Sequence, residues 1–355
     1  MINRVPEFEI KELQSISPSS FVSMRKCRYR FVLQKSLDKV VLLPSSPNAY
    51  FGSILHKAIE EINNQQIKCE DDLMIFIESK IKSTENYLKE NNFIGMIPLK
   101  KSVKDYGMKI ILLKRKLESL SELKSDSQSV QSASEMYFEC ADGNIKGIVD
   151  HIFVNNNAIE LIDYKTGKII DEYTGQVKED YKEQLKLYAY LYFEKFNGFP
   201  DKLSIVGLND SKYTINFNFD ECLKLFNEAK ELLEKTNQNI KEGKLKPSLS
   251  KQNCIYCSCR PACFSYQASL KNCSDDVLES DVYGTLKSIR QFLDGTVNII
   301  ISNINGEFVV KNIRSSNYEE LTSYRNKNIS LYNLYYYEPF SFRTNDNTVI
   351  YAHSQ

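Results

Sequence analysis

The chain has 355 residues, which is enough for one large domain with a buried core and a smaller second domain. Its 46 Lys and Arg balance 46 Asp and Glu, so composition alone indicates no nucleic-acid partner. The segment MINRVPEFEIKELQ lacks the apolar core of a signal peptide, and runs such as residues 110–113 are too short to span a bilayer. We therefore expect a soluble, cytoplasmic protein without a membrane partner, whose nine cysteines are metal ligands or buried thiols rather than disulfides.

The first part of the chain is predicted to be helical. Ser17 followed by Pro18 is typical of a helix start. Apolar side chains then recur at helical spacing in one continuous helix, at Phe21, Met24, Cys27 and Phe31. A second helix is predicted over residues 51–61. Periodicity near 3.6 continues through residues 71–125, which predicts a helical insertion of about residues 60–130.

Charge is unevenly distributed along this insertion. From Lys80 to Lys124 there are eleven Lys or Arg residues and five Asp or Glu residues, a surplus of six positive charges. Two interpretations remain open at this point. The stretch is either a solvated helical face or an arm that follows a phosphate backbone.

The hydrophobic pattern then changes from helical to alternating. Strands are predicted at residues 135–140, 145–154 and 158–165, separated by the turn sequences DGN and NNN, which indicates an antiparallel meander. The elements predicted next are a helix at 178–196, a strand at 203–208 and a helix at 220–242.

The last strand of the meander ends in a carboxylate and a lysine, in the run IELIDYKTGK. Side chains alternate along a strand, so Asp163 and Lys165 project from the same face. Asp150, in GIVD, lies on the adjacent strand, and neighbouring strands are ~5 Å apart. The two aspartates could therefore share one divalent metal ion, with the lysine placed to stabilise developing negative charge.

Three further residues have polar side chains suited to such a site. Neutral His56 could add a nitrogen ligand, which suits manganese as well as magnesium. Gln184 and Tyr188 lie four apart on a predicted helix and so share a face. Taken singly, His56 is as well explained as a hydrogen-bonded core histidine and Tyr188 as core packing, whereas Asp-x-Lys at a buried strand end is harder to explain structurally.

The segments GSILHKAIEE, GIVD, IDYKTGK and QLKLYAYL resemble the successive motifs of the PD-(D/E)XK superfamily, in its RecB-like branch. This resemblance implies an α/β fold with a restriction-endonuclease-like core, in which helices flank a mixed sheet. It implies a metal-dependent nuclease centre using Mg2+ or Mn2+. In that centre the roles carry over by motif to His56, Asp150, Asp163, the backbone carbonyl of Tyr164, Lys165, Gln184 and Tyr188. Glu135 lies where some relatives have an additional acidic residue.

The function implied is hydrolysis of DNA phosphodiester bonds by an exonuclease that prefers single-stranded ends, in DNA repair, recombination or mobile-element and defence processing. No GxxxxGK[ST] motif is found, so a helicase, if one takes part, would be a separate protein. Two rival hypotheses are a non-catalytic DNA-binding or scaffold subunit of a helicase–nuclease complex and a zinc-bearing RNA enzyme.

A cysteine-rich loop, residues 247–273, supplies three thiols in the pattern Cys254-x2-Cys257-x5-Cys263. A zinc knuckle could take a fourth ligand from Cys259 or Cys273, and an iron–sulfur cluster could recruit a distant thiolate; spacing alone leaves both open.

The loop also resembles that of the iron–sulfur subset of RecB-like nucleases, such as the CRISPR-associated and AddB-type domains. That resemblance implies a [4Fe–4S] cluster whose fourth ligand is Cys27, in SPSSFVSMRKCRYRF. Cys259 and Cys273 would then be spare. Three other cysteines are predicted to be buried thiols: Cys69, Cys140 and Cys222.

Residues 274–355 form a separate predicted unit that follows the nuclease-like region 1–273. Three strands, a short helix and two strands, with one strand over 329–337, give the order of an OB-fold. The unit is rich in aromatic residues between 331 and 342 and has seven basic against ten acidic residues. Base stacking by these rings and docking to the rest of the chain or to a partner are both open.

Overall fold

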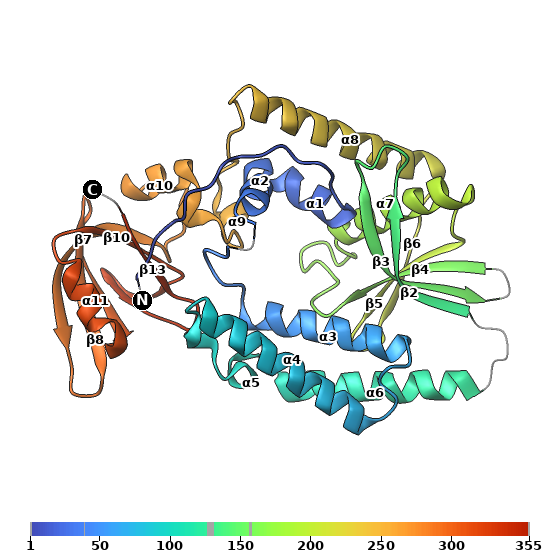
Figure 1. Cartoon of the computed structure of the whole chain (residues 1–355), viewed down its shortest axis with the longest axis horizontal. Coiled ribbons are helices and arrows are strands. Elements are labelled where there is room, and N and C mark those ends of the chain that lie inside the picture. The colour runs from blue at the N-terminus through green and yellow to red at the C-terminus, as the bar shows by residue number, and fades with distance from the viewer. Residues whose placement is uncertain (1, 39, 126–130, 156–157, 354–355) are drawn as a thin grey trace.

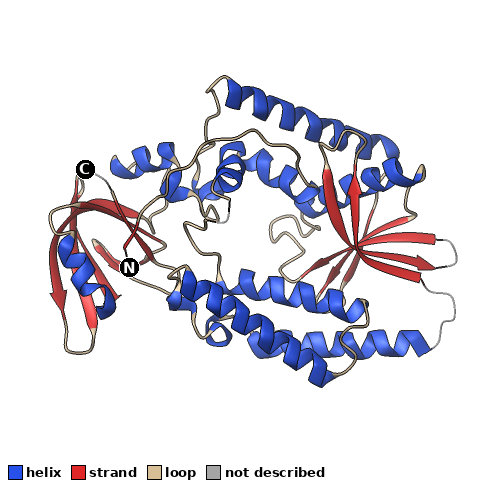
Figure 2. Ribbon diagram, viewed as in Figure 1, coloured by secondary structure: helices blue, strands red, loops and turns tan. Residues whose placement is uncertain are grey.

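A five-stranded mixed sheet forms the centre of the larger part of the molecule. The computed structural model describes residues 2–38, 40–125, 131–155 and 158–353, apart from the side chains of residues 119–125, 131–134 and 315. The strands lie in the order β2-β3-β4-β5-β6 (Figure 2). Their bounds are β2 (Gln131–Glu139), β3 (Lys146–Asn155), β4 (Ala158–Lys165), β5 (Lys202–Gly207) and β6 (Lys212–Ile215). The antiparallel meander β2–β3–β4 is confirmed, β5 is parallel to β4, and β6 is an additional short antiparallel strand that the sequence pattern did not reveal.

Helices cover both faces of this sheet, so β4 and β5 are buried along both of their faces. Leu161 and Ile205 pack on one face under α1 (Pro18–Lys26), α7 (Glu179–Phe196) and α8 (Phe219–Lys241). Ile162 and Val206 pack on the other face against the predicted helical insertion. Helix α3 (Pro47–Asn63), which ends where the insertion begins, lies on the same face. The insertion contains α4 (Glu70–Glu90), a 3-10 turn at Ile94–Met96, α5 (Leu99–Ser102) and α6 (Tyr106–Ser125) (Figure 1). The α/β class with a mixed sheet flanked by helices is thus confirmed.

The first predicted helix is interrupted, contrary to the expectation of one continuous helix. Cys27 has an extended backbone, with φ −158° and ψ 102°, and separates α1 from α2 (Arg28–Ser36). Phe21 and Met24 before the break pack against the central sheet. Cys27 packs in a different cluster with the cysteine-rich loop. The break therefore directs one residue of an otherwise helical stripe into a second core.

The C-terminal unit is built on an eight-stranded sheet in the order β1-β13-β10-β7-β8-β9-β12-β11. The elements are β7 (Val282–Gln291), β8 (Thr296–Asn303), β9 (Gly306–Arg314), a 3-10 turn (Ser315–Asn317), α11 (Tyr318–Ser323), β10 (Asn328–Tyr332), β11 (Tyr335–Glu338), β12 (Ser341–Arg343) and β13 (Val349–Ala352). The single strand expected over 329–337 is wrong, because Asn333 has φ 60° and divides it. The unpredicted β1 (Ile2–Asn3) pairs in parallel with β13. The OB-fold assignment and the boundary at residue 273 stay predictions.

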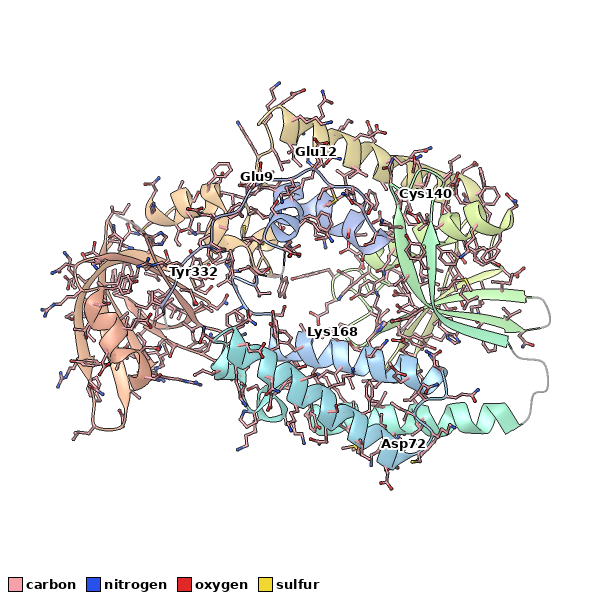
Figure 3. All side chains as sticks on the ribbon, viewed as in Figure 1. Glu9, Glu12, Asp72, Cys140, Lys168 and Tyr332 are labelled. Carbon is pink, nitrogen blue, oxygen red and sulfur yellow. The ribbon has the colours of Figure 1, made fainter. Side chains whose placement is uncertain are left out.

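Close contacts join this unit to the rest of the chain. Arg260, in a 3-10 turn (Arg260–Ala262) between α9 (Lys251–Cys254) and α10 (Phe264–Lys271), is buried, and its Nε donates to Asp281 Oδ2 at 2.8 Å. Its Nη1 donates to the carbonyls of Cys254 and Cys257. On α10, Gln267 Nε2 donates to Tyr332 Oη at 2.6 Å, and Figure 3 labels Tyr332 at this junction. The cysteine-rich loop is thereby held directly against the C-terminal sheet.

Within the described ranges, no helix combines the length and apolar character needed to cross a bilayer.

Candidate active site

A cavity of about 1380 Å3 lies between α3, the start of α6 and the C-terminal end of β4. Six of the predicted active-site residues line it: His56, Asp150, Asp163, Tyr164, Lys165 and Gln184. Figure 3 labels Lys168, which lines the cavity on the segment that follows β4 and faces α3. The residues that the sequence motifs single out are therefore brought together, although His56 and Asp150 are 94 positions apart in the chain.

The two aspartates have different partners. Asp150 Oδ2 is 2.9 Å from His56 Nε2 and accepts the backbone N–H of Tyr164 at 2.8 Å. Asp163 Oδ2 is 2.7 Å from Lys165 Nζ, as expected for side chains on the same face of a strand. The strand pairing places Asp150 and Asp163 on adjacent strands at the same end of the sheet. Each carboxylate thus has one cationic or imidazole partner within the cavity.

Helix α7 connects the aspartate and the lysine of β4 through one amide. Gln184 Nε2 donates to Asp163 Oδ1 at 3.2 Å, and its Oε1 accepts from Lys165 Nζ at 3.2 Å. Two hydrogen bonds from a side chain on a long helix restrict the rotamers of both partners. Gln184 therefore positions the charged pair.

Tyr188 lies outside the cavity lining and supports the site through β3. Its hydroxyl donates to the backbone carbonyl of Ile148 on β3 at 2.7 Å. A Cβ at Gly147 would lie 3.1 Å from the Tyr188 ring, so only glycine permits this approach without displacing the ring. Tyr188 thus holds the strand that carries Asp150 and is a positioning residue.

Burial makes the charge on Asp163 costly. The exposed fraction of Asp163 is 2%, and burial, with the nearby charge of Asp150, raises its pKa to about 6 while Lys165 opposes the shift. The hydrogen bond to Asp150 raises the pKa of His56. In the described part of the chain, Asp163 Oδ2 is buried without a hydrogen bond of good geometry besides its ion pair. Two carboxylates and an imidazole are oxygen and nitrogen donors of the kind that Mg2+ or Mn2+ accepts, so the residues fit the predicted metal.

The pKa of Asp163 predicts how the metal-free protein responds to pH. An unfolded Asp has a pKa of ~3.9, so the folded state binds this proton more tightly than the unfolded state does. The resulting contribution to the free energy of unfolding is fully present below about pH 4. That stabilisation is lost as the pH rises through about 6. We expect Asp163→Asn to remove a penalty on the order of 2 kcal/mol at pH 8 and none at pH 4. Urea unfolding in EDTA at both pH values measures the difference. Equal pH slopes for the variant and the original chain would contradict it.

Sequence reasoning missed two residues beside the predicted ones. Lys165 Nζ lies 4.6 Å from the centroid of the Tyr181 ring, on the same face of α7 as Gln184 and three residues before it. Glu60, one turn after His56 on α3, is buried and pairs with Lys57 at 2.5 Å. Helical spacing from the motif residues could have found Tyr181 and Glu60.

Glu135, which lies where some relatives have an additional acidic residue, also lines the cavity from β2. A hydrogen bond with Glu60 and partial burial raise its pKa. Its backbone has φ 53°, a left-handed conformation that is uncommon for a non-glycine residue. A second pair of acidic side chains therefore stands at the edge of the site.

Four cysteines line a second, small cavity on the other side of α1 and α2. They are Cys27, Cys254, Cys257 and Cys263. All four are buried in one cluster, although Cys27 lies far from the others in sequence. Burial and the charges of the other three raise the pKa of Cys263 to about 12. Such mutual repulsion would be relieved by a bound cation, so the donors fit an iron–sulfur or zinc centre.

The burial of the remaining cysteines agrees only in part with the prediction. Cys140 and Cys222 are buried in the main core, as expected. Cys69 is exposed, which corrects the prediction, because it occupies the N-cap of α4 at the surface. Cys259 is also buried, and its hydrogen bond to Cys257 lowers the pKa of Cys257 to about 7.

In the described ranges, no three His, Cys, Asp or Glu side chains stand together at metal-ligand spacing. The case for each candidate metal centre therefore depends on the types of its donor side chains and on the fact that these side chains line the same cavity.

Comparison with known proteins identifies the family. The model of the PD-(D/E)XK nuclease superfamily matches residues 15–264, and the chain belongs to this superfamily. The chain is 30% identical over 136 residues to the RecB subunit of the RecBCD enzyme of Borreliella burgdorferi; the match covers 32% of this chain and 12% of that subunit. A crystal structure described as a candidate exonuclease from Eubacterium rectale is 12% identical, with a TM-score of 0.37 over 66% of this chain and 84% of that one.

Proposed function

We propose that the chain is a metal-dependent deoxyribonuclease that hydrolyses DNA phosphodiester bonds and acts preferentially on single-stranded ends. The observation that carries this proposal is the convergence of Asp150, Asp163 and Lys165 on one cavity, with Gln184 bridging Asp163 and Lys165. Membership of the nuclease superfamily supports the same reaction.

Each residue has a defined task in this reaction. Asp150, Asp163 and His56, with the carbonyl of Tyr164 by family resemblance, would hold Mg2+ or Mn2+. When bound, such an ion neutralises charge on the scissile phosphate and activates water. Lys165 Nζ donates to the attacking water or to the phosphate oxygen that gains charge, as the water oxygen bonds to phosphorus and the ester P–O bond breaks. Gln184 keeps the ammonium group in that position.

Lysines at the rim of the cavity favour contact with a phosphate backbone. Lys104 and Lys109, from the basic stretch of the helical insertion, line the cavity together with Lys57 and Lys168. Burial lowers the pKa of Lys109, whose Nζ donates to Asn48 Oδ1 at 2.7 Å. Positive side chains around a large open cavity suit a polyanion better than a small neutral ligand.

The cysteine site is best explained by a [4Fe–4S] cluster held by Cys27, Cys254, Cys257 and Cys263. Cys27 lines the same small cavity as the other three thiols, which favours the cluster over a zinc knuckle confined to the loop. When bound, the cluster would act as a staple between the start and the end of the family-matched region.

The wider process is DNA repair, recombination or mobile-element and defence processing, with a separate helicase as a possible partner. The rival function is a DNA-binding or scaffold subunit without activity. A lysine paired with a buried aspartate and held by a glutamine has no evident use in a scaffold, which favours the enzyme.

The test is a cleavage assay with purified protein. We expect Mn2+-dependent degradation of end-labelled linear single-stranded DNA, less cleavage of blunt duplex, and none in EDTA. A covalently closed single-stranded circle of the same sequence should survive, because an exonuclease requires an end. Equal cleavage of circle and linear strand would replace the exonuclease assignment with an endonuclease.

A further inference from the structure

A row of exposed aromatic side chains occupies the edge of the C-terminal sheet. Tyr335, Tyr336 and Tyr337 on β11 and Phe340 in the turn to β12 are 62%, 51%, 46% and 56% exposed. We call these four residues the aromatic edge. β11 is the last strand of its sheet. Contiguous exposed rings of this size on a protein surface commonly mark a binding site.

Two residues of the aromatic edge, Tyr336 and Phe340, pack against further rings. The Tyr336 ring is 5.7 Å from that of Phe342, which is buried. Phe308 on β9 lies 6.0 Å from Phe342 and 5.7 Å from Phe340. Rings already fixed by such contacts lose little conformational entropy when a planar ligand stacks on them.

Two cations lie among these rings. The Arg343 guanidinium is 3.5 Å from the centroid of the Tyr337 ring, and Lys311 Nζ is 5.4 Å from it. Lys311 also pairs with Glu338 at 3.1 Å. Among the residues that the structure describes, Arg343 Nε is buried and has no hydrogen-bond acceptor. Its guanidinium is thus stacked on the Tyr337 ring, and its Nε lacks an acceptor.

The edge is poorly suited to pairing with a strand of another protein or of a second copy. The register shifts between Tyr336 and Glu338, which forms a β-bulge. The Lys311–Glu338 ion pair adds charge along the same edge. Bulges and charges on edge strands are the features that oppose edge-to-edge association.

We propose that the aromatic edge is a binding site for single-stranded DNA. Unpaired bases stack on the exposed tyrosine rings, and a backbone phosphate accepts from Arg343. Duplex DNA does not fit this chemistry, because its base faces are covered by their neighbours. The link to cleavage rests on the proposed nuclease function, since the bound strand would supply the substrate, whereas the binding itself requires no cleavage.

The test measures binding to the full chain in EDTA, so that no DNA is cut. The variant Tyr335→Ala/Tyr337→Ala removes two rings and leaves Tyr336, which packs on Phe342, in place. Fluorescence anisotropy with a labelled thymidine oligonucleotide should show affinity weakened roughly tenfold or more, the effect of losing stacked bases. The matched control Tyr335→Phe/Tyr337→Phe keeps both rings and should bind within about twofold of the original chain.

A second probe separates stacking from phosphate binding. An abasic oligonucleotide of equal length keeps the phosphates but offers no bases, so its affinity should not distinguish the alanine variant from the phenylalanine variant. Arg343→Gln should weaken the affinity for both oligonucleotides. It should also lower the slope of log affinity against log salt concentration by about the value of one phosphate contact.

Three results would overturn the proposal. One is equal affinity of the alanine and phenylalanine variants for the thymidine strand. Another is a loss of affinity of the alanine variant for the abasic strand that equals its loss for the thymidine strand. The third is a self-association, seen by sedimentation, that only the alanine variant loses while its DNA affinity stays unchanged.

If the alanine variant unfolds, photocrosslinking the original chain to a 5-bromouracil oligonucleotide decides the question. Adducts in the peptide spanning Tyr335 to Phe342 support the site, and adducts found only elsewhere overturn it. Failure of the nuclease proposal would be seen separately, as an absence of Mn2+-dependent cleavage by the original chain.

Discussion

Replacing Lys165 with Ala is expected to abolish DNA cleavage and to leave DNA binding nearly unchanged. The ammonium group lies 2.7 Å from Asp163 Oδ2 and 3.2 Å from Gln184 Oε1, so it is fixed at the point where charge would develop on the phosphate. Loss of one preorganised donor of this kind costs roughly 100- to 1000-fold in rate, and more where the group also orients the water. Single-turnover cleavage with Mn2+ and anisotropy in EDTA measure the two properties separately.

A matched control is Lys186→Ala on the same helix as Gln184. Lys186 pairs with Glu221 at 2.6 Å and does not line the cavity, so its loss removes equal charge without touching the site. Its cleavage rate should stay within about threefold of the original, as for most surface changes. Unchanged cleavage by Lys165→Ala would remove the nuclease assignment, and loss of DNA binding together with cleavage would place Lys165 in DNA binding rather than in the chemical step.

Replacing Cys263 with Ala is expected to remove the iron–sulfur absorbance of the protein and to destabilise it strongly. The original chain should be brown with absorbance near ~400 nm, typical of thiolate–iron charge transfer. A link between residues 27 and 263 closes a very long loop, and on a disulfide-type chain-entropy estimate it contributes about 5 kcal/mol. Cys263 lines the thiol cavity with the three other proposed ligands. Absorbance, iron content and thermal unfolding of the variant measure the effect.

Further cysteine variants distinguish the two metal hypotheses. Cys69→Ala, which removes an exposed thiol, should change neither colour nor stability. Under the cluster hypothesis Cys27→Ala reproduces the Cys263→Ala effect and Cys259→Ala does not. A zinc knuckle predicts a colourless, zinc-containing protein that tolerates Cys27→Ala and loses its metal with Cys259→Ala or Cys273→Ala.

Local patterns determined much of the central fold. Alternation of apolar and polar residues predicted the meander β2–β3–β4, and helical periodicity predicted α7 and α8 to within a few residues. The same two-residue repeat placed Asp163 and Lys165 on one face, and they lie 2.7 Å apart. These features depend on residues that are near one another in sequence, so the chain itself specifies them.

Packing decided the features that depend on distant segments. Cys27 belongs to a helical stripe in the sequence, yet the backbone breaks there and the thiol joins a different core. Tyr188 shares a helix face with Gln184, but its hydroxyl reaches a carbonyl of β3 rather than the charged groups. Glu60 and Glu135 meet only because α3 crosses the end of the sheet.

The sequence by itself determined the secondary elements around the site and the chemistry of its side chains, because alternation, helical spacing and the motif residues are all short-range properties. Only the tertiary structure decided which of those side chains meet. Burial of the apolar face of α3 brings His56 to Asp150, which lies 94 positions away in the chain. Burial in the C-terminal sheet likewise brings β1 to β13. Burial is a sum over many distant residues, and no short stretch of sequence specifies it.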